Sequence, residues 1–562
     1  MAACHDVSPP CSLQLCRMYC YVLFSFLLSL DMTSTWEQES GRTIERGIER
    51  RRLLTAAGLA ATAALVADHP QRAYATVASS SAPLPYPFTL GIASGDPLPT
   101  GVVLWTRLAP SPFEADGGMV PDSFPVQWVV AVDPGMAGVV RRGTALAHAA
   151  YAHSVHVDVD GLEPDREYWY RFRSGAHLST VGRTRTAPAP GTHLDHLDLV
   201  VASCQSLGAG WYHAWKDAAA NPADLVYFAG DYIYEYATDA TSVRWPYTPP
   251  LPADFARETD TLGRFRQQYG LYKSDPELQE AHRVSPWMIT WDDHEVYNDY
   301  DAEDPAPYQL RANAYRAFWE HMPLRAPQRP SGYTARMYRQ LSYGDLVRFH
   351  VLDTRQYRTG QLPGGAVGDT SERRDPSRQL LGARQEAWLL DSLGSGETTW
   401  DVMANTVLFS RLDSDDTEGE RFSTGQWDAY QAAQQRVIDT VAAKDAGGFV
   451  VLTGDIHRNY HLNVLADFED PDSKVVGVEF AGTSISSGRD GGETDAGLEV
   501  RKRANPHLVK ADLRRGYLRC RIAHDLWTTQ VRAIDRISTP DYSAWTSHTL
   551  VTDPRRPGIE IA

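Results

Sequence analysis

Downstream of His193, apolar runs of strand type end again and again in a polar side chain, and this pattern limits the folds that the chain can adopt. Helical stretches separate the runs, and this alternation is typical of an α/β domain. Ligands bind at the carboxyl ends of the strands in such folds, so we expect one metal or phosphate site there. The runs, each with the residues that follow it, are 197–202 with Cys204, 225–229 with Asp231, 287–291 with Asp292 and Asp293, 346–352 with Asp353, 400–403 with Asn405, and 449–452 with Asp455 and His457.

The stretch before His193 carries only β signals. Short alternating runs at 101–106, 126–130, 154–159 and 167–172 are separated by Gly and Pro turns. They predict a β-sandwich of immunoglobulin or fibronectin type. A chain of 562 residues is also long enough for more than one domain. The expected organisation is a leader at 76–87, a β domain at 88–190, an α/β domain at 194–540 and a C-terminal tail at 541–562.

The first 75 residues read as an export signal. Three arginines, Arg50 to Arg52, precede an apolar run from Leu53 to Val66, which is too short to span a bilayer. Ala73-Tyr74-Ala75 follows as a cleavage pattern, so the order of elements resembles a twin-arginine signal that is removed after Ala75. An earlier apolar stretch, 18–30, leads to the hypothesis that translation starts at Met32.

Charge and cysteine content narrow the function. The formal net charge is -17, which argues against a nucleic-acid groove because phosphate backbones select basic surfaces. An anionic substrate would then need a local positive charge, such as a bound cation. Four of the six cysteines lie in the first 75 residues. Cys204 and Cys520 remain, and they form either one disulfide or two free thiols, of which Cys204 is a candidate ligand.

The segment Gly230-Asp231-Tyr232-Ile233-Tyr234 contains a carboxylate and, three residues later, a phenol. The carboxylate can bridge two cations, and a phenolate oxygen suits a trivalent metal such as Fe(III). A Gly-Asp turn followed by a packed tyrosine explains the same residues equally well. The motif alone leaves both interpretations open.

Two further segments carry chemistry. In Trp291-Asp292-Asp293-His294-Glu295, Asp293 can ligate a metal while His294 faces the substrate as a general acid or base. In Gly454-Asp455-Ile456-His457, two donors stand two residues apart, although a buried core histidine is the alternative. Arg355 and Arg358 can grip phosphate oxygens or serve as structural partners of Asp353, and the sequence does not decide between these roles.

Together these motifs resemble the PhoD-type alkaline phosphatases. The resemblance runs in the order of the family over about residues 88–535. The matching stretches are 91–97 with 104–107, Cys204-Gln205, 230–235, 291–296, 352–358 and 454–457.

The resemblance implies a fold and a cofactor. The fold is an N-terminal fibronectin-like β-sandwich followed by a metallophosphatase-like αββα domain, and the centre combines Fe(III) with Ca²⁺. Asp231 would bridge the two metals. The implied ligands are Cys204, Asp231, Tyr234 and His457 for iron, and Asp231, Asp293, Asp455 and Asn405 for the second metal.

The expected activity is therefore that of an exported phosphoesterase. A hydroxide held at the metals would attack phosphorus, and His294 or calcium would help the leaving group depart. Substrates are small-molecule, lipid or polymer phosphoesters, and the protein is expected as a periplasmic or secreted monomer, exported by the twin-arginine machinery. Two alternatives remain. One is a phosphodiesterase or phospholipase D-type activity on the same centre, and the other is a calcium-binding adhesion protein without turnover.

Overall fold

The computed structural model describes residues 84–303, 308–417, 419–444 and 447–562. The expected twin-arginine signal, the start at Met32 and most of the leader lie outside these residues. The described residues form one compact unit. Among them, no helix combines the length and the apolar character needed to cross a bilayer.

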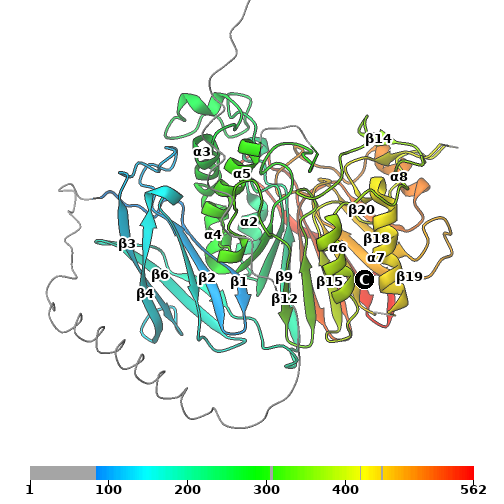
Figure 1. The fold of residues 1–562 in the computed structure, drawn as a ribbon, viewed down its shortest axis with the longest axis horizontal. Coiled ribbons are helices and arrows are strands. Elements are labelled where there is room, and N and C mark those ends of the chain that lie inside the picture. Colours follow the sequence, from blue (N-terminus) through cyan, green and yellow to red (C-terminus); the bar gives the residue numbers. More distant parts are fainter. Residues whose placement is uncertain (1–83, 304–307, 418, 445–446) are drawn as a thin grey trace, which may run out of the picture. The chain divides into compact units, whose positions relative to one another are not determined.

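Two large β-sheets form the centre of the protein (Figure 1). The first sheet has ten strands, of which β9, β10 and β11 run parallel at its middle. In spatial order the strands are β24 (Arg556–Ile561), β23 (Ala544–Asp553), β22 (Trp527–Ile534), β21 (Arg515–Ala523), β9 (His196–Ala202), β10 (Leu225–Ala229), β11 (Trp287–Thr290), β1 (Ile92–Leu98), β2 (Gly101–Arg107) and β5 (Ser154–Val159).

The second sheet has seven strands, and four of them run parallel. In spatial order they are β12 (Arg339–Tyr343), β13 (Val347–Val351), β15 (Trp400–Ala404), β17 (Phe449–Thr453), β19 (Val475–Ala481), β18 (Asn459–Leu465) and β20 (Leu508–Asp512). The strands predicted at 197–202, 225–229, 287–291, 346–352, 400–403 and 449–452 are confirmed to within about two residues.

The two sheets pack face to face, and helices cover their outer faces, as the alternation along β9 illustrates. Leu199 and Val201 point into the core between the sheets, whereas Val200 and Ala202 point into the core under the helices. Helices α2 (His213–Ala219), α3 (Leu262–Lys273), α4 (Pro276–Val284) and α5 (Tyr308–His321) cover the first sheet. Helices α6 (Gly382–Ser392) and α7 (Gln431–Ala443) cover the second. The layer order is therefore helix, sheet, sheet, helix.

The N-terminal β region is not separate from this architecture. A third sheet of β3 (Ser123–Ala131), β4 (Val139–His148), β6 (Glu167–Ser174), β7 (His177–Leu178) and β8 (Gly182–Arg185) shares a core with β1, β2 and β5. The latter three strands continue the first sheet, because β1 pairs with β11 at Gly95 and Trp287. The strands predicted within 88–190 are thus present. The assignment to the immunoglobulin or fibronectin type stays a prediction.

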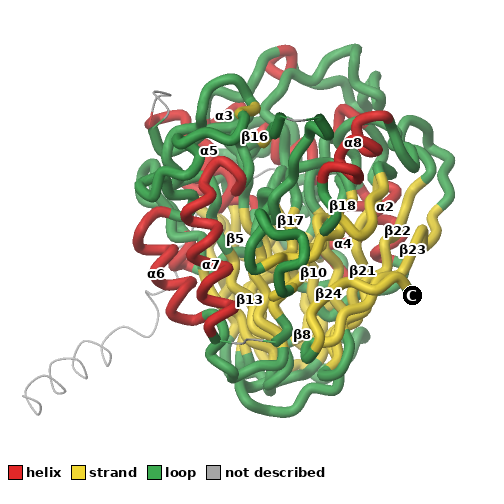
Figure 2. The backbone as a smooth tube through the Cα atoms, turned by 90° about the vertical axis from the view of Figure 1, so that its right-hand side faces the viewer, coloured by secondary structure: helices red, strands yellow, loops and turns green. Residues whose placement is uncertain are grey.

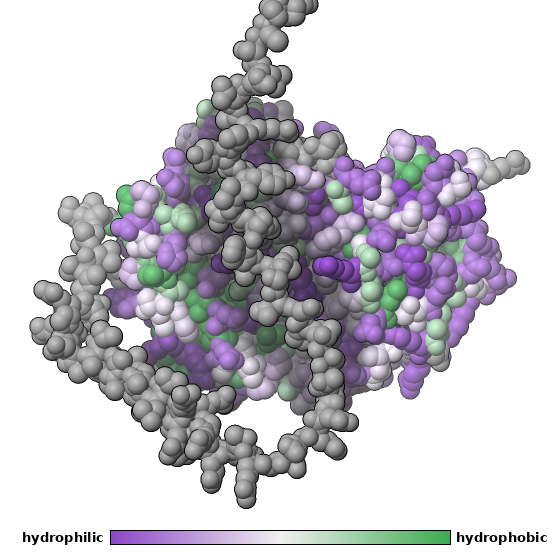
Figure 3. All heavy atoms as spheres, viewed as in Figure 1, coloured by the Kyte–Doolittle hydropathy of each residue, from purple (hydrophilic) through white to green (hydrophobic). Residues whose placement is uncertain are grey.

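The C-terminal segment 541–562, which we expected as a tail, instead contributes β23 and β24 to the edge of the first sheet. Beyond one end of the strands, loops and short elements gather, among them β14 (Ala366–Val367), β16 (Phe422–Ser423) and α8 (Ala496–Ala504) (Figure 2). On the face drawn in Figure 3, polar side chains predominate and apolar ones form scattered patches.

Candidate metal centre

The predicted site residues converge where the parallel strands of both sheets end. Cys204 follows β9, Asp231 follows β10, and Asp293 follows β11 in the first sheet, while Asp455 and His457 follow β17 in the second. A parallel bridge between Ser203 and Ser484 connects the two sheets directly beside these ends.

Four donors of different chemistry meet in the first group of side chains. One ligand atom each from Cys204, Asp231 and His457 lies within 4.8 Å of the others. The hydroxyl of Tyr234 lies 3.0 Å from Asp231 Oδ2 and 3.0 Å from His457 Nε2. Adjacent ligands of an octahedral ion with bonds of about 2.1 Å lie about 3 Å apart. This group therefore has the spacing and the donor set of a metal site.

A second group adjoins the first and consists of carboxylates. Oxygens of Asp292, Asp293 and Asp455 lie within 4.8 Å of one another, and Asp231 and Asp293 form a similar group with His294. Asp293 Oδ1 is buried without a hydrogen-bond partner. Hard oxygen donors are the ligands that Ca²⁺ and Mg²⁺ prefer. The crowding of negative charge and the unpartnered oxygen both fit a bound cation.

The backbone at this site is strained. Cys204, Asp231, Asp455 and His457 all have positive φ angles, between 53° and 61°. Residues other than glycine rarely adopt this conformation, and each such residue costs on the order of 1–3 kcal/mol. Four strained donors at one site indicate that the fold maintains the position of these side chains against a local cost.

The glycines before two of these residues permit the close approach of the strands. A Cβ atom on Gly230 would lie 2.5 Å from the backbone nitrogen of Asp292, and one on Gly454 would lie 2.8 Å from Ser203 Cβ. Both distances are far shorter than a carbon contact allows. The Gly-Asp pattern at both strand ends therefore has a steric origin.

Burial and crowding oppose ionisation of most of the donors. Asp293 is the exception, because its burial is outweighed by Arg355 and His294, which hold the pKa of its carboxyl well below the usual range. The pKa of Asp455 is raised to about 8 by burial and by the charge of Asp292. Burial and then Asp231 raise the pKa of the Cys204 thiol well above its usual value, and the same causes act on the Tyr234 phenol. Burial and Arg515 lower the pKa of His457 to about 3, which keeps its imidazole neutral. A cation is the natural counter-charge for anionic forms of this group.

His294 lines a pocket that lies over these two groups of side chains, and Glu235 Oε2 lies 2.7 Å from its Nδ1. Burial by itself lowers the pKa of His294, but the charges of Asp231 and Asp293 and the bond to Glu235 raise it to about 11. Cations held by the same carboxylates would weaken this shift. The environment favours a histidine that carries a proton.

Both arginines that were expected to bind substrate are fully buried. Arg355 donates to both oxygens of Asp292, at 2.5 and 2.8 Å, and its Nη2 lies 3.0 Å from Asp455 Oδ1. Arg358 donates to the carbonyl oxygen of Asp299 at 2.8 Å. The side chain of Arg355 thus neutralises the cluster of carboxylates at the site, and it does not pair with Asp353. A direct contact with substrate stays a prediction for both.

The hydrogen bonds of Asn405 in the described part of the chain reach none of the residues of the two groups. Its amide nitrogen donates to the carbonyl of Val407, and its Oδ1 accepts from the indole of Trp427 at 3.3 Å. Its backbone carbonyl oxygen accepts a hydrogen bond from the hydroxyl of Tyr227 at 2.7 Å. The side chain is therefore engaged within the protein, and its role as a ligand stays a prediction.

Sequence reasoning missed three residues that support the centre. Ser487 donates to the Tyr234 hydroxyl at 2.7 Å, and Gln426 donates to Asp455 Oδ2 at 2.6 Å. Glu295 accepts backbone N–H groups of Tyr232 at 2.6 Å and Asp292 at 2.8 Å, which holds both acidic loops in place. Glu295 stood in a recognised motif, but Ser487 and Gln426 are remote in sequence and carried no local signal.

The pocket over the centre has a volume of about 200 Å³. Its floor includes Asp231, Asp293 and His457, and Gln361 and Thr424 line it as well. The two cysteines that remained open in the sequence are both free and buried. Cys204 is thus available as a ligand, whereas Cys520 packs in the core between the sheets.

Comparison with known proteins agrees with this arrangement. The chain matches the model of the PhoD-like phosphatases over residues 199–531, and the model of their N-terminal domain over residues 73–188. It is 41% identical over 482 residues to alkaline phosphatase D of Bacillus subtilis (strain 168), which covers 84% of this chain and 82% of that protein. A solved structure of PhoD superposes with a TM-score of 0.81 at 41% identity, and the match covers 86% of this chain and 93% of that one.

The matches and the site define the chain as a phosphoric ester hydrolase. More narrowly, it belongs to the PhoD-like phosphatase family. The resemblance inferred from the motifs is confirmed. The alternative of an adhesion protein without turnover finds no support in this membership.

Proposed function

We propose that this protein is an exported, metal-dependent phosphatase that hydrolyses phosphate monoesters, phosphate diesters or both. The observation that carries the proposal is the convergence of Cys204, Asp231, Tyr234 and His457 beside the carboxylates of Asp293 and Asp455. Thiol, phenol and imidazole donors together are hard to explain as a purely structural acidic cluster.

We infer Fe(III) for the first group and Ca²⁺ for the second. A phenolate oxygen is a hard donor that suits a trivalent ion, and Asp231, which belongs to two of the groups, is suited to bridge. The carboxylates of Asp293 and Asp455 suit calcium. When bound, such cations neutralise the charge of the phosphate and activate a water for attack.

The chain's own residues then position and protonate the substrate. Glu235 holds Nδ1 of His294, which leaves Nε2 for a proton donated to the leaving oxygen. Gln426 orients Asp455, and Arg355 keeps the carboxylates from repelling one another. Because Arg355 is buried, its first contribution is to hold the metal ligands in place, and a direct contact with phosphate stays a prediction.

Elemental analysis and a visible spectrum of the purified mature protein test the metal assignment. Bound iron should give a charge-transfer band that Tyr234→Phe abolishes, while Tyr236→Phe, a change at a neighbouring half-exposed ring, should leave it in place. A colourless, metal-free protein that stays inactive after reconstitution would contradict the proposal.

Export is part of the same proposal. If the twin-arginine signal operates, the protein found outside the cytoplasm begins at Thr76, and replacing Arg51 and Arg52 by lysine stops its release. N-terminal sequencing of the exported protein checks this. An exported protein that retains the segment from Leu53 to Ala75 would exclude the signal.

A further inference from the structure

A second cavity, of about 260 Å³, adjoins the pocket over the metal centre. The two share Ser423, Gln426 and Asp455 in their linings. A molecule with its phosphate at the centre can therefore extend another group into this space. We call it the arginine cavity, and the residues that define it are Leu408, Leu412, Ile456, Arg458, Tyr460 and Arg501.

The two arginines of this cavity form no ion pair with a carboxylate among the described residues. Arg458 Nη1 lies 3.5 Å from the carbonyl of Ile456, and Arg501 Nη1 donates to the carbonyl of Gly497 at 3.0 Å within α8. Arg503 on the same helix instead pairs with Asp416 at 2.6 Å. In a chain with 71 acidic and 54 basic side chains, two uncompensated arginines facing one cavity predict an anionic ligand.

A buried polar atom points to a ligand independently. Tyr460 is only 2% exposed, and its hydroxyl has no hydrogen-bond partner within the described part of the chain. Leaving such a group unsatisfied costs on the order of 1–3 kcal/mol, whereas a ligand in the cavity can accept a hydrogen bond from it. The hydroxyl thus adds a donor beside the guanidinium groups.

Each carboxylate at the cavity has an arginine partner. Asp428 has Arg373 at 3.9 Å, and Asp455 has Arg355 at 3.0 Å. These partners reduce the repulsion that the two carboxylates exert on an incoming anion. The remaining wall is apolar, because Leu408, Leu412 and Ile456 belong to one hydrophobic cluster. The cavity consequently suits an organic body that carries a negative charge.

We propose that the arginine cavity binds the second ester group of a phosphodiester substrate, and that it selects groups that carry another anion on a short apolar body. This inference rests on the proposed phosphoesterase function and specifies its substrate class. Arg458 and Arg501 are thereby residues that determine specificity and take no part in the reaction itself.

Two matched substrates test the proposal. Both are p-nitrophenyl phosphodiesters, and their second ester groups are pentyl in one and 4-carboxybutyl in the other, so that only a carboxylate distinguishes them. We expect the wild type to prefer the carboxylate substrate in kcat/KM by roughly tenfold, as for one or two charge-assisted hydrogen bonds. The preference should decline with added salt.

Arg458→Gln and Arg501→Gln should each reduce this preference severalfold, chiefly through KM, and the double variant should abolish it. Tyr460→Phe should reduce it less. Arg503→Gln is the control, because it removes the same charge from the exposed side of α8. Circular dichroism establishes that each variant is folded.

The outcomes separate the two proposals. A wild type that hydrolyses both diesters without preferring the carboxylate, or a preference that survives in the double variant, overturns the arginine cavity and leaves the phosphoesterase intact. Hydrolysis of p-nitrophenyl phosphate without hydrolysis of either diester overturns the cavity and restricts the enzyme to monoesters. Failure to hydrolyse any of the three overturns both.

Discussion

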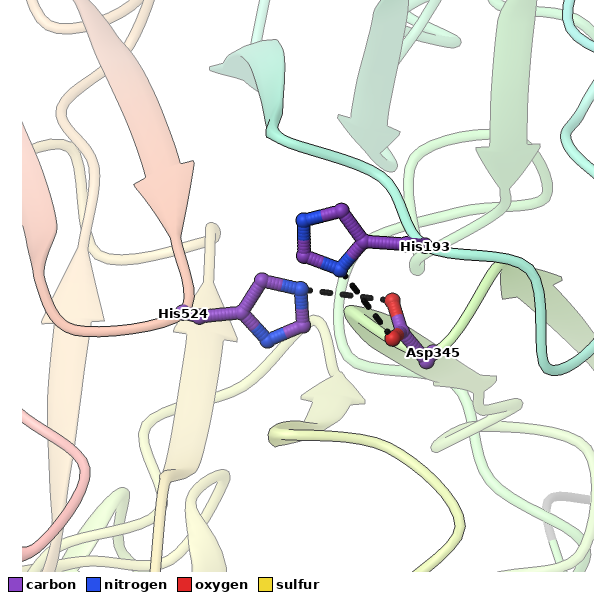
Figure 4. A group of neighbouring side chains, drawn as sticks. All are labelled: His193, Asp345 and His524. Atoms are coloured by element: carbon purple, nitrogen blue, oxygen red, sulfur yellow. Dashed lines mark hydrogen bonds and ion pairs between the residues drawn. The ribbon is translucent and has the colours of Figure 1, made fainter.

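Two groups of histidine and carboxylate side chains lie in different parts of the molecule, and only one has the properties of a metal site. The one without these properties lies away from the candidate centre. It consists of His193, Asp345 and His524 and is drawn in Figure 4. Its ligand atoms are as close as those at the candidate centre, since His193 Nδ1 and His524 Nε2 lie 3.4 and 3.2 Å from oxygens of Asp345.

The rings of His193 and His524 are stacked, with centroids 4.7 Å apart and planes 9° from parallel. An imidazole binds a metal in the plane of its ring, and two stacked parallel rings do not share such a position for one ion. The side chain of His193 is also 66% exposed. Proximity of suitable atoms is therefore a weak criterion by itself. Burial, strained backbone and diverse donors distinguish the centre at Asp231.

The largest expected difference between the two groups concerns the bridging carboxylate. Asp231→Asn should lower kcat by roughly a thousandfold or more and release metal, because the residue belongs to two ligand groups. Asp345→Asn makes the same change at the other group and should leave kcat near the wild-type value. Steady-state kinetics and elemental analysis check both. Equal loss in the two variants would erase the distinction.

The two free cysteines offer a second contrast, between a side chain at the candidate centre and one in the core. Cys204→Ser should lose iron and about a hundredfold in activity, since the loss of one ligand weakens the whole centre. Cys520 packs between the sheets, where its sulfur lies 3.6 Å from Thr529 Oγ1. Cys520→Ser should keep its metals and lose about 1 kcal/mol of stability. Iron content and thermal unfolding of both variants measure this contrast.

Glu235 tests the protonation of His294. Glu235→Gln should lower kcat by about tenfold for an alkyl phosphate, whose leaving group needs a proton, and much less for p-nitrophenyl phosphate. The metal content should not change, because Glu235 is in none of the groups of potential ligands. An equal loss on both substrates would show that Glu235 supports the fold of the site and not proton transfer.

The smallest effect is expected for acid stability at the exposed group. Burial raises the pKa of Asp345. The backbone N–H of Leu194 and the nearby histidines lower it by a larger amount, so the net shift of the pKa is downward. A lowered carboxyl pKa stabilises the fold above the unfolded-state value and loses that contribution as pH falls through the folded-state value. Asp345→Asn should reduce the free energy of unfolding that is lost on acidification by less than about 1 kcal/mol, because Asp345 and its histidine partners are exposed to solvent. Urea unfolding between pH 5 and pH 3 gives the measurement, and a larger loss would indicate a tighter interaction.

The strands and the polar residues at their ends could be predicted from the order of residues alone. Apolar runs such as 225–229 and 449–453 are local signals, since a strand buried on both faces needs a continuous apolar segment. Cys204, Asp231, Asp293 and Asp455 follow such runs, so their convergence was predictable from the rule that parallel strands end at one edge. The motifs also predicted the family correctly.

Which side chains meet across the two sheets depends on how the sheets pack. Arg355 pairs with Asp292 rather than Asp353, Ser487 reaches Tyr234 across 253 positions of the chain, and Asn405 faces Trp427. The sequence likewise did not predict that the edge strands β23 and β24 join the first sheet. The physical reason is common to all of them. Side-chain orientation, ion pairing and edge pairing depend on which segments the packing brings together, and residue order along the chain does not encode that distance.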